Sequence, residues 1–279
     1  SSYCRSWFDF GYFCLDCSTI LCCPLVIYLL ASIFIMFITP SYISFAMPQP
    51  KILVGCPTSD HKAYCLDQYA EAIKSLTYSN YDILLMDNSQ YSDYMKHILS
   101  LKIPAIKAPY FPTARERIVH SRNLLRKKVL EEGYDYFLSL EQDVIPPKDI
   151  LERLLQHKQP VVAGVYYMEY DLKKQGIVIG KNILPLLYKQ HDHENLIQLT
   201  PEEVQKSQFM RVAASGLGCM LIHRSTLEKI FFRYAEGKLV FDDIWFCQDL
   251  EREGIPLYVD TSVKCKHLMR LMDWNSVQK

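Results

Sequence analysis

The segment "GYDYFLSLEQDVIPP", residues 133–147, decides the fold class of this chain. An apolar and aromatic run typical of a buried strand ends in two carboxylates, Glu141 and Asp143, which are followed by Pro146 and Pro147. Because alternate residues of an extended chain project to the same side, the two acids are expected to face one point beyond the strand. Proline does not continue a central strand, so the pair is expected at the rim of a sheet.

Two carboxylates at such a rim predict a cation site. Carboxylates held close together repel each other unless a cation or a proton lies between them. A hard divalent ion such as Mg²⁺ is bound in proteins by one or two carboxylates together with substrate phosphates. The alternative interpretation is a surface loop with two solvated acids.

After Lys51 the chain alternates apolar runs with helical patterns. Strands are expected at residues 51–56, 81–87, 134–140, 160–167, 219–223 and 255–260. Helices are expected at residues 62–76, 113–132, 148–157, 225–234 and 244–253, and capping boxes are expected for Thr113 with Glu116, Thr200 with Glu203, and Ser225 with Glu228. The alternation predicts an α/β domain with a mostly parallel sheet, covered by helices on both faces and binding its ligands at the carboxyl ends of the strands.

The composition excludes several classes of protein. The chain has 279 residues with 31 basic and 31 acidic side chains, and no basic stripe interleaved with aromatic residues occurs in it, so nucleic-acid binding is not expected. No Walker A sequence is present, and "GLG" at residues 216–218 lacks the third glycine of a dinucleotide-binding fingerprint. The sequence therefore indicates neither a P-loop kinase nor a dehydrogenase.

The N-terminal region differs in composition from the rest. No charged residue occurs between Asp16 and Lys51, and the apolar run at residues 19–38 would form about 30 Å of helix, the thickness of a bilayer core. The domain boundaries expected from this pattern are a tail at 1–17, a transmembrane helix at 18–40, a linker at 41–50, an α/β domain at 51–270 and a C-terminal tail at 271–279.

Charges on either side of that run bear on its orientation. Lys51 and Lys62 follow it, whereas only Arg5 precedes it. Because cytoplasmic flanks carry an excess of basic residues, a single-pass membrane protein with a cytoplasmic catalytic domain is expected.

The stretch "SRNLLRKKVLEEGYDYFLSLEQDV", residues 121–144, resembles the part of GT-A-fold, family 2-like glycosyltransferases that runs from an Ala-Arg-Asn helix start to the DxD motif. The similarity covers about residues 51–268. It implies a GT-A fold, a nucleotide-sugar donor and a divalent metal, Mn²⁺ or Mg²⁺. The donor-binding residues that it implies are Pro57 and Thr58 in "CPT", Asp87 in "DNS", the pair Arg122 and Asn123, and Glu141 and Asp143 at the place of DxD. The first residue of that motif is Glu here rather than Asp.

Two further segments resemble the acceptor side of the same family. "ASGLGCMLIHRSTLEKI", residues 214–230, supplies Gly216 and Gly218, and "FDDIWFCQDLEREG", residues 241–254, has Asp242 and Asp243 where the family carries Glu-Asp at a helix start. The resemblance implies Asp243 as the base that deprotonates the acceptor hydroxyl, Asp242 as its substitute, and Trp245 as an acceptor-side residue. The alternative for the two acids is helix N-capping, which is compatible with catalysis.

His267 in "DTSVKCKHL" ends the similar region, where several glycosyltransferases of this fold have a metal-binding histidine. The resemblance implies Asp143, Glu141 and His267 as the metal ligands, and an imidazole ligand favours Mn²⁺ over Mg²⁺. The alternative is a structural histidine.

These observations predict a metal-dependent glycosyltransferase that moves a sugar from a nucleotide-diphosphate donor to an acceptor hydroxyl on a membrane-associated glycan or lipid. One alternative is a nucleotidyltransferase of similar layout, although "VGCPTSDHK" at residues 54–62 lacks the glycine-rich basic loop expected for that class. Another is a catalytically degenerate domain that only binds glycans or proteins.

Overall fold

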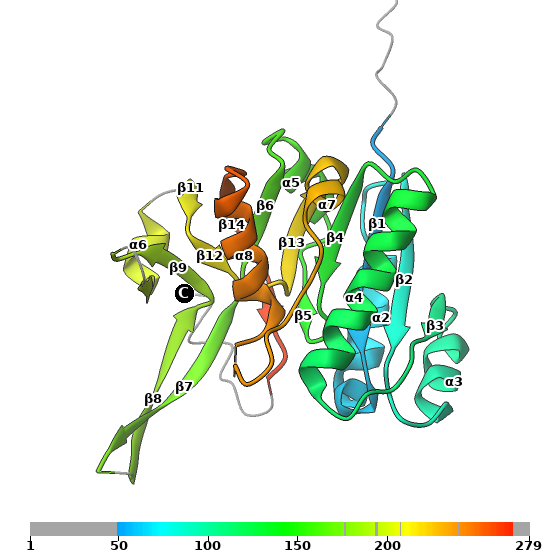
Figure 1. Cartoon of the computed structure of the whole chain (residues 1–279), viewed down its shortest axis with the longest axis horizontal. Helices are drawn as coiled ribbons and strands as arrows, with labels where there is room; N and C mark the ends of the chain where they lie inside the picture. The colour runs from blue at the N-terminus through cyan, green and yellow to red at the C-terminus, as the bar shows by residue number, and fades with distance from the viewer. Residues whose placement is uncertain (1–48, 176, 193–194, 207, 239, 270–279) are drawn as a thin grey trace, which may run out of the picture. The chain divides into compact units, whose positions relative to one another are not determined.

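The computed structural model describes residues 49–269, apart from residues 176, 193–194, 207 and 239 (Figure 1). The strands are β1 (Ile52–Thr58), β2 (Tyr81–Asp87), β3 (Ala105–Lys107), β4 (Tyr136–Leu140), β5 (Val144–Ile145), β6 (Val161–Val165), β7 (Tyr167–Lys174), β8 (Ile177–Pro185), β9 (Leu187–Gln190), β10 (Leu196–Gln198), β11 (Phe209–Val212), β12 (Ala214–Ser215), β13 (Cys219–His223), β14 (Leu257–Lys264) and β15 (Lys266–His267). The helices are the 3-10 helix η1 (Asp60–Cys65) and the α-helices α2 (Leu66–Lys74), α3 (Asp93–Ser100), α4 (Ala114–Glu131), α5 (Ile150–Leu155), α6 (Pro201–Gln205), α7 (Arg224–Lys229) and α8 (Asp242–Arg252).

The centre of the domain is an eight-stranded sheet with the strand order β11-β14-β6-β13-β4-β1-β2-β3. The ladders β4–β1, β1–β2, β2–β3 and β6–β14 are parallel, as predicted, whereas β13 and β11 are antiparallel to their neighbours. β13 runs backwards because the chain enters it at the carboxyl end of β4, where Cys219 lies opposite Leu140. The residues just before β13 therefore reach the same rim as those just after β4.

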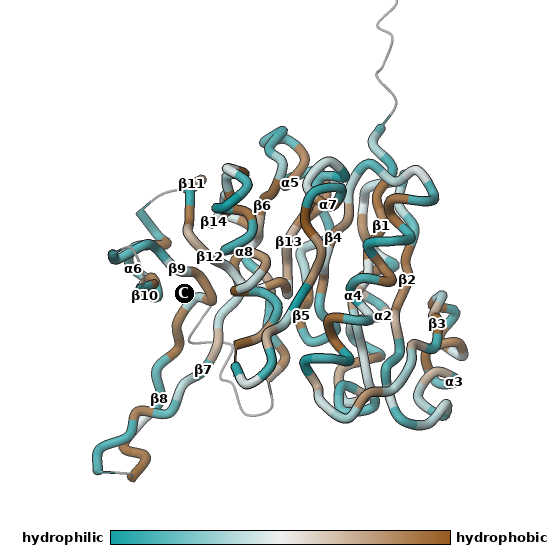
Figure 2. The backbone as a smooth tube through the Cα atoms, viewed as in Figure 1, coloured by the Kyte–Doolittle hydropathy of each residue, from teal (hydrophilic) through white to brown (hydrophobic). Residues whose placement is uncertain are grey.

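Both faces of the sheet are buried, which explains why its central strands are almost entirely apolar. Leu53 and Phe137 pack with residues of α4, α7 and α8 on one face, whereas Ile52 and Leu138 pack with residues of α2, α3 and α5 on the other. Figure 2 shows β1, β4, β6 and β13 as mainly hydrophobic segments in the middle of the molecule. The prediction of an α/β sheet covered on both sides is confirmed.

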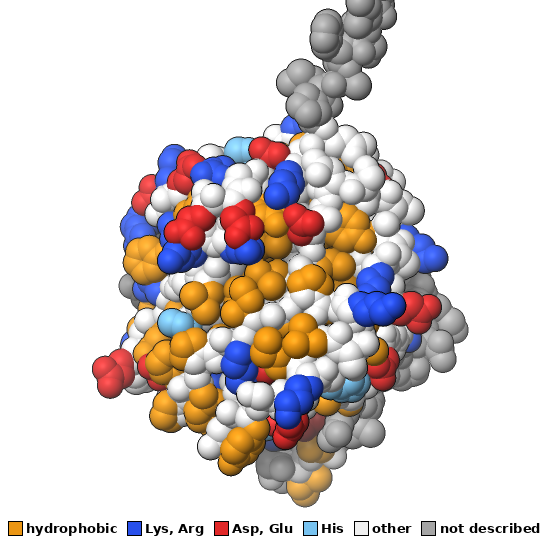
Figure 3. Space-filling model, turned by 90° about the vertical axis from the view of Figure 1, so that its right-hand side faces the viewer, with side chains coloured by type: hydrophobic (Ala, Val, Ile, Leu, Met, Phe, Trp, Pro, Cys, Tyr) orange, Lys and Arg blue, Asp and Glu red, His pale blue; other side chains and the backbone are white. Residues whose placement is uncertain are grey.

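The edge of the sheet formed by β3 presents a mixed surface. On that side of the molecule, basic and acidic side chains are interspersed around hydrophobic ones, and neither charge gathers into one continuous patch (Figure 3).

Several local predictions need correction. The helix expected at residues 62–76 is divided into η1 and α2, and Lys62 N bonds Ser59 O, three residues back, as in a 3-10 turn. Thr113 and Thr200 cap α4 and α6 as predicted, but α7 is capped by the His223 side chain, so the expected cap at Ser225 is wrong. The sequence analysis also missed α3 and the strands β3, β5, β8–β12 and β15, most of which are short.

Three smaller sheets adjoin the central one. β7 and β8 form an antiparallel hairpin that projects from the body of the domain (Figure 1), and β10, β9 and β12 form a three-stranded sheet. β15 pairs with β5 in the register that sets His267 opposite Val144. That short ladder brings the C-terminal part of the domain to the residue that follows Asp143.

The predicted single-pass membrane localisation, with a cytoplasmic catalytic domain, is corrected: no helix within the described part of the chain has the length and apolar character needed to cross a bilayer. The tail expected at residues 1–17, the span at 18–40 and the tail at 271–279 lie outside the described residues.

Candidate active site

The acidic pair after β4 does not continue as an extended strand. The carbonyl of Glu141 accepts a hydrogen bond of 2.8 Å from Val144 N, so Glu141, Gln142 and Asp143 form a turn. The side chains of the two acids consequently have different partners: Glu141 contacts Arg122, and Asp143 contacts His267 and Lys62. The expectation that both acids face one point is wrong, because it assumed an extended backbone beyond Leu140.

Asp143 is the acid that lies in a pocket. The pocket has a volume of about 620 Å³ and is lined by Asp60, His61, Lys62, Tyr64, Asp143, Met168, His267 and Met269. Asp143 itself is 4% exposed, and its Oδ1 is buried without a hydrogen-bond partner among the described residues. Burial raises the pKa of Asp143, but the hydrogen bond with His267 and the positive charge of Lys62 outweigh burial and hold the pKa at about 2. The group is therefore a carboxylate at neutral pH.

His267 is oriented toward this carboxylate by a backbone contact. Its Nδ1 lies 2.8 Å from the carbonyl oxygen of Tyr167, which can only accept, so Nδ1 carries a proton. The other ring nitrogen, Nε2, lies 3.4 Å from Asp143 Oδ2. Lys62 forms an ion pair with the same carboxylate oxygen, so a positive charge lies beside both atoms.

These two residues fit a divalent metal. A histidine that donates one ring N–H to a backbone carbonyl and presents its other nitrogen is the usual arrangement at metal sites. The partnerless Oδ1 of Asp143 offers a second donor atom. The described residues contain no group of three His, Cys, Asp or Glu side chains able to hold a metal, so further ligands would have to come from water or from substrate phosphates. Glu141, the third predicted ligand, is bound to Arg122 instead.

Arg122 connects three segments beneath the rim. It lies on α4, is 1% exposed, and its Nε is 2.7 Å from Asp242 Oδ2 while its Nη2 is 3.1 Å from Glu141 Oε1. Nη1 donates to Ser139 Oγ in β4 over 2.6 Å. The guanidinium therefore holds the end of β4, the first acid of the motif and the start of α8 together.

Asp243 differs from its neighbour Asp242, which pairs with Arg122, in forming no ion pair with a basic side chain in the part of the chain that the structure describes. Its Oδ1 accepts a hydrogen bond of 2.8 Å from Ile244 N. Burial, followed by the negative charges of Asp242 and Glu141, raises the pKa of Asp243 to about 6. A carboxylate with a pKa near the working pH is suited to general base catalysis.

The remaining donor-side residues lie at the carboxyl ends of β1 and β2. Pro57 and Thr58 end β1, and the Thr58 hydroxyl contacts Tyr94 Oη at 3.3 Å and the side chain of Gln142. Asp87 is fully buried, 3.0 Å from Lys107 Nζ, and accepts from Ser89 N.

Asn123 and Trp245 have structural partners. The Asn123 amide pairs with both the N–H and the carbonyl of Phe232, at 3.0 and 2.8 Å. Trp245 stacks beneath Arg233, whose guanidinium carbon lies 4.3 Å from the ring centroid.

Gly216 and Gly218 pack against a side chain that the sequence analysis did not consider. Gly218 N donates to Tyr166 Oη over 3.0 Å, and a Cβ at Gly218 would lie 2.7 Å from Tyr166 Cζ. A Cβ at Gly216 would also collide with the Tyr166 hydroxyl. The need for glycine is therefore explained by the buried tyrosine, and Gly218 O in turn accepts from Glu141 N at 2.9 Å.

The sequence analysis missed two other residues here. Lys62 was considered only as a charge, and Gln142 only as the middle of the motif. The position of Gln142 between two acids was a signal that its side chain has other partners, since the middle residue of such a turn points away from the residues on either side.

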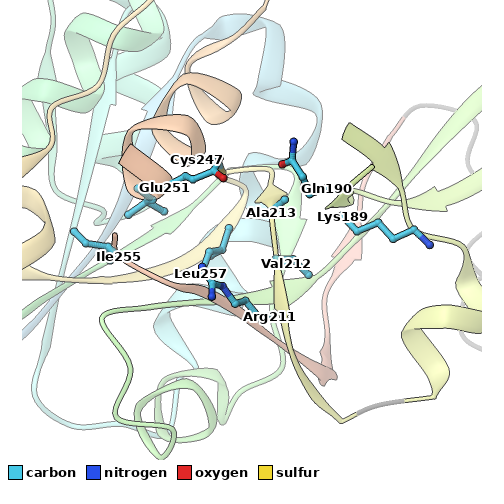
Figure 4. Close-up of a pocket in the computed structure, with 10 residues that line it drawn as sticks. Lys189, Gln190, Arg211, Val212, Ala213, Cys247, Glu251, Ile255 and Leu257 are labelled. Carbon is cyan, nitrogen blue, oxygen red and sulfur yellow. The ribbon is translucent and has the colours of Figure 1, made fainter. Parts of the chain in front are cut away.

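A second groove lies between β9, β11 and α8. It has a volume of about 290 Å³ and is lined by Lys189, Gln190, Arg211, Val212, Ala213, Cys247, Leu250, Glu251, Ile255 and Leu257 (Figure 4). It shares no lining residue with the pocket around Asp143.

Comparison with known proteins identifies the fold. No protein-family model matches the sequence, and no curated protein matches it either. Among solved structures, the chain is similar to GalNAc-T7 with UDP, GalNAc and Mn²⁺, with a TM-score of 0.58 and 13% identity, over 81% of this chain and 45% of that one. It is also similar to the mannosyltransferase PcManGT from Pyrobaculum calidifontis in complex with GDP-Man and Mn²⁺, with a TM-score of 0.54 and 11% identity, over 91% of this chain and 66% of that one.

The fold is thus a mixed α/β fold similar to the GT-A fold of these glycosyltransferases. The chain spans less than half the length of the first of these neighbours.

Proposed function

We propose that the protein is a metal-dependent glycosyltransferase that moves a sugar from a nucleoside-diphosphate donor to an acceptor hydroxyl. The observation that carries this proposal is the pair His267 and Asp143, whose Nε2 and Oδ2 atoms lie 3.4 Å apart in a pocket at the carboxyl end of β4. Ligands of open α/β sheets bind at such ends. The two neighbours whose structures contain Mn²⁺ with UDP or GDP-Man share this fold, which supports the choice of donor class.

Asp143 and His267 are the residues that would hold the divalent cation. When bound, the cation neutralises the negative charge that grows on the leaving nucleoside diphosphate. Asp143 is suited to this role because its pKa of about 2 keeps it ionised throughout the neutral range. The Tyr167 carbonyl accepts from His267 Nδ1 and so directs Nε2 toward Asp143.

Asp243 would accept the proton of the attacking hydroxyl. Asp242 is less suited to this role, because its carboxylate is already bound to the buried guanidinium of Arg122. A positioned base typically contributes about 10²–10⁴-fold to the rate. Glu141 raises the pKa of both Asp243 and Lys62, so the base and the pocket around Asp143 lie within electrostatic range of the same carboxylate.

Arg122 serves as a positioning residue in this proposal. By holding Glu141 and Asp242 it fixes the turn that carries Asp143 relative to the helix that carries Asp243. Thr58 and Asp87 mark the donor side, because they end β1 and β2, the first and second strands beyond β4 in the parallel part of the sheet. Asn123 and Trp245 are left out of the site.

The test is release of nucleoside diphosphate from a panel of UDP- and GDP-sugars in the presence of Mn²⁺. We expect turnover by the wild type, with loss to background in Asp143→Asn and in Asp243→Asn. Lys96→Met is the control, since Lys96 is 75% exposed on α3 and pairs only with Asp93. Undiminished release by folded Asp143→Asn would rule the proposal out, and absence of turnover with every donor would favour a degenerate, binding-only domain.

A further inference from the structure

Asp143 already has a cation in the described structure. Lys62, on η1, forms an ion pair with Asp143 Oδ2, the same oxygen that lies 3.4 Å from His267 Nε2. The Lys62 side chain is 37% exposed, whereas that of Asp143 is 5% exposed. The ammonium therefore approaches a buried carboxylate from the open side of the pocket that both residues line.

The backbone of Lys62 is fixed in this place by Gln142, the residue between the two acids. Gln142 is 1% exposed, and its Nε2 donates to the Lys62 carbonyl over 2.6 Å. Its Oε1 accepts from Tyr94 Oη over 2.7 Å and contacts the Thr58 hydroxyl. A buried amide with hydrogen-bond partners on both sides has little freedom to move, so Gln142 fixes the position of η1 relative to the turn.

A divalent cation at Asp143 cannot leave this ion pair unchanged. The ammonium and the metal would both be held by one carboxylate, and two positive charges that close repel each other strongly in a partly buried site. Lys62 would have to turn away from Asp143, which its flexible four-carbon side chain allows. Its ammonium would then need another anion as a partner. In a pocket that receives a nucleoside diphosphate, the donor's phosphates are that anion.

We propose that Lys62 is the counter-ion of Asp143 in the free protein and a ligand of the donor's diphosphate in the loaded protein. The inference rests on the proposed function and adds the residue that binds the diphosphate beside the metal. The exchange of partners couples the two binding events: metal binding releases Lys62 for the phosphates, and phosphate binding removes the competitor of the metal.

The first measurement is the affinity for Mn²⁺ without nucleotide. The electron paramagnetic resonance signal of unbound Mn²⁺ reports how much of the ion is bound. Lys62→Met removes the competing charge and keeps the stem, so it should bind Mn²⁺ about fivefold more tightly than the wild type, the change expected for an ion pair worth about 1 kcal/mol. Lys62→Arg and Lys96→Met should bind Mn²⁺ as the wild type does. Unchanged or weaker binding by folded Lys62→Met would overturn the proposal.

The second measurement is the affinity for UDP and GDP at saturating Mn²⁺. Here Lys62→Met should bind about fivefold more weakly, because a charged contact to phosphate is lost, whereas Lys62→Arg should retain most of the affinity. Equal nucleotide affinity in wild type and Lys62→Met would overturn the second half of the proposal.

Asp143→Asn separates this inference from the function on which it rests. If Asp143→Asn loses Mn²⁺ binding while Lys62→Met matches the wild type, the metal site stands and the role of Lys62 is rejected. If Asp143→Asn binds Mn²⁺ as well as the wild type does, the metal site itself is wrong. Lack of Mn²⁺ binding by both the wild type and Lys62→Met would reject the two together.

Discussion

Arg122 and Asp242 form a buried ion pair, with Nε of the guanidinium 2.7 Å from Oδ2 of the carboxylate. The two residues are 120 positions apart in the chain and lie on α4 and α8. Their contact divides two adjacent acids into different roles, because Asp242 is paired with Arg122 while burial and the charge of Asp242 raise the pKa of Asp243. The same guanidinium holds Glu141, so a single cation organises the rim of the sheet.

Loss of that cation should be costly. Arg122→Met leaves the Asp242 carboxylate buried without a partner, and breaking a buried ion pair costs about 3–5 kcal/mol. We therefore expect the midpoint of thermal unfolding to fall by roughly 10 °C, given about 2–4 °C per kcal/mol for a domain of this size. Arg252→Met is the matched control, because Arg252 is 65% exposed and should change the midpoint by little. A similarly small change in the midpoint of Arg122→Met would show that the buried pair of Arg122 and Asp242 does not stabilise the fold.

The pKa of Asp243 predicts the pH dependence of the reaction. A general base must be ionised, so kcat/KM should rise with pH through a limb near pH 6, the value to which burial and Asp242 raise this pKa. Asp243→Asn should lower kcat by at least about 10²-fold. With nucleoside diphosphate release as the readout, a pH profile of the wild type checks the first statement, and kcat of Asp243→Asn beside that of the wild type checks the second. A profile that is flat from pH 5 to pH 8 would remove Asp243 from the role of base.

Asp243 should also reduce stability at neutral pH. Its pKa in the folded protein, about 6, lies above the ordinary value of 3.8, so the folded state binds the proton more tightly than the unfolded state does. The ionised group thus destabilises the fold above pH 6, and this cost disappears as the pH falls toward 3.8. Asp243→Asn, which has no charge to desolvate, should unfold at a higher temperature than the wild type at pH 7.5, and the difference should vanish near pH 4. An Asn variant less stable than the wild type at pH 7.5 would show that the carboxylate is stabilised.

A substitution at Gly218 distinguishes two explanations for the glycine: close packing against Tyr166, or contact with the acceptor. An added Cβ would lie 2.7 Å from Tyr166 Cζ, and overpacking of this kind costs about 1–3 kcal/mol. Gly218→Ala should therefore lower the unfolding midpoint, whereas Gly180→Ala, with its nearest neighbour at 3.7 Å, should leave it nearly unchanged. If Gly218→Ala keeps the stability of the wild type and only the KM for the acceptor rises, the glycine is needed for acceptor binding and not for packing against Tyr166.

His267 should contribute to metal affinity. His267→Ala removes the nitrogen that faces Asp143, and we expect Mn²⁺ affinity to fall by about tenfold or more. His97→Ala is the control, because His97 is a half-exposed residue of α3 outside the pocket. Calorimetric titration of Mn²⁺ into both variants makes the comparison, and equal affinities would return His267 to a structural role.

Much of the fold follows from short-range patterns. Strands buried on both faces are mainly apolar, so β1, β2, β4 and β13 could be read directly from their composition. Thr113 and Thr200 start helices because capping needs only a hydroxyl and an N–H three residues ahead. The same local logic misplaced the cap of α7, where an imidazole took the role expected of a hydroxyl.

Sequence alone determined that a carboxylate would stand at the end of a central strand, because strand length and proline position are local properties. Only the tertiary structure decided what that carboxylate meets. The turn after Leu140 separates Glu141 from Asp143, the β15–β5 ladder brings His267 to Asp143, and η1 brings Lys62. Contacts between residues 80 to 124 positions apart depend on how strands are ordered in the sheet, and the pattern of neighbouring residues does not encode that order.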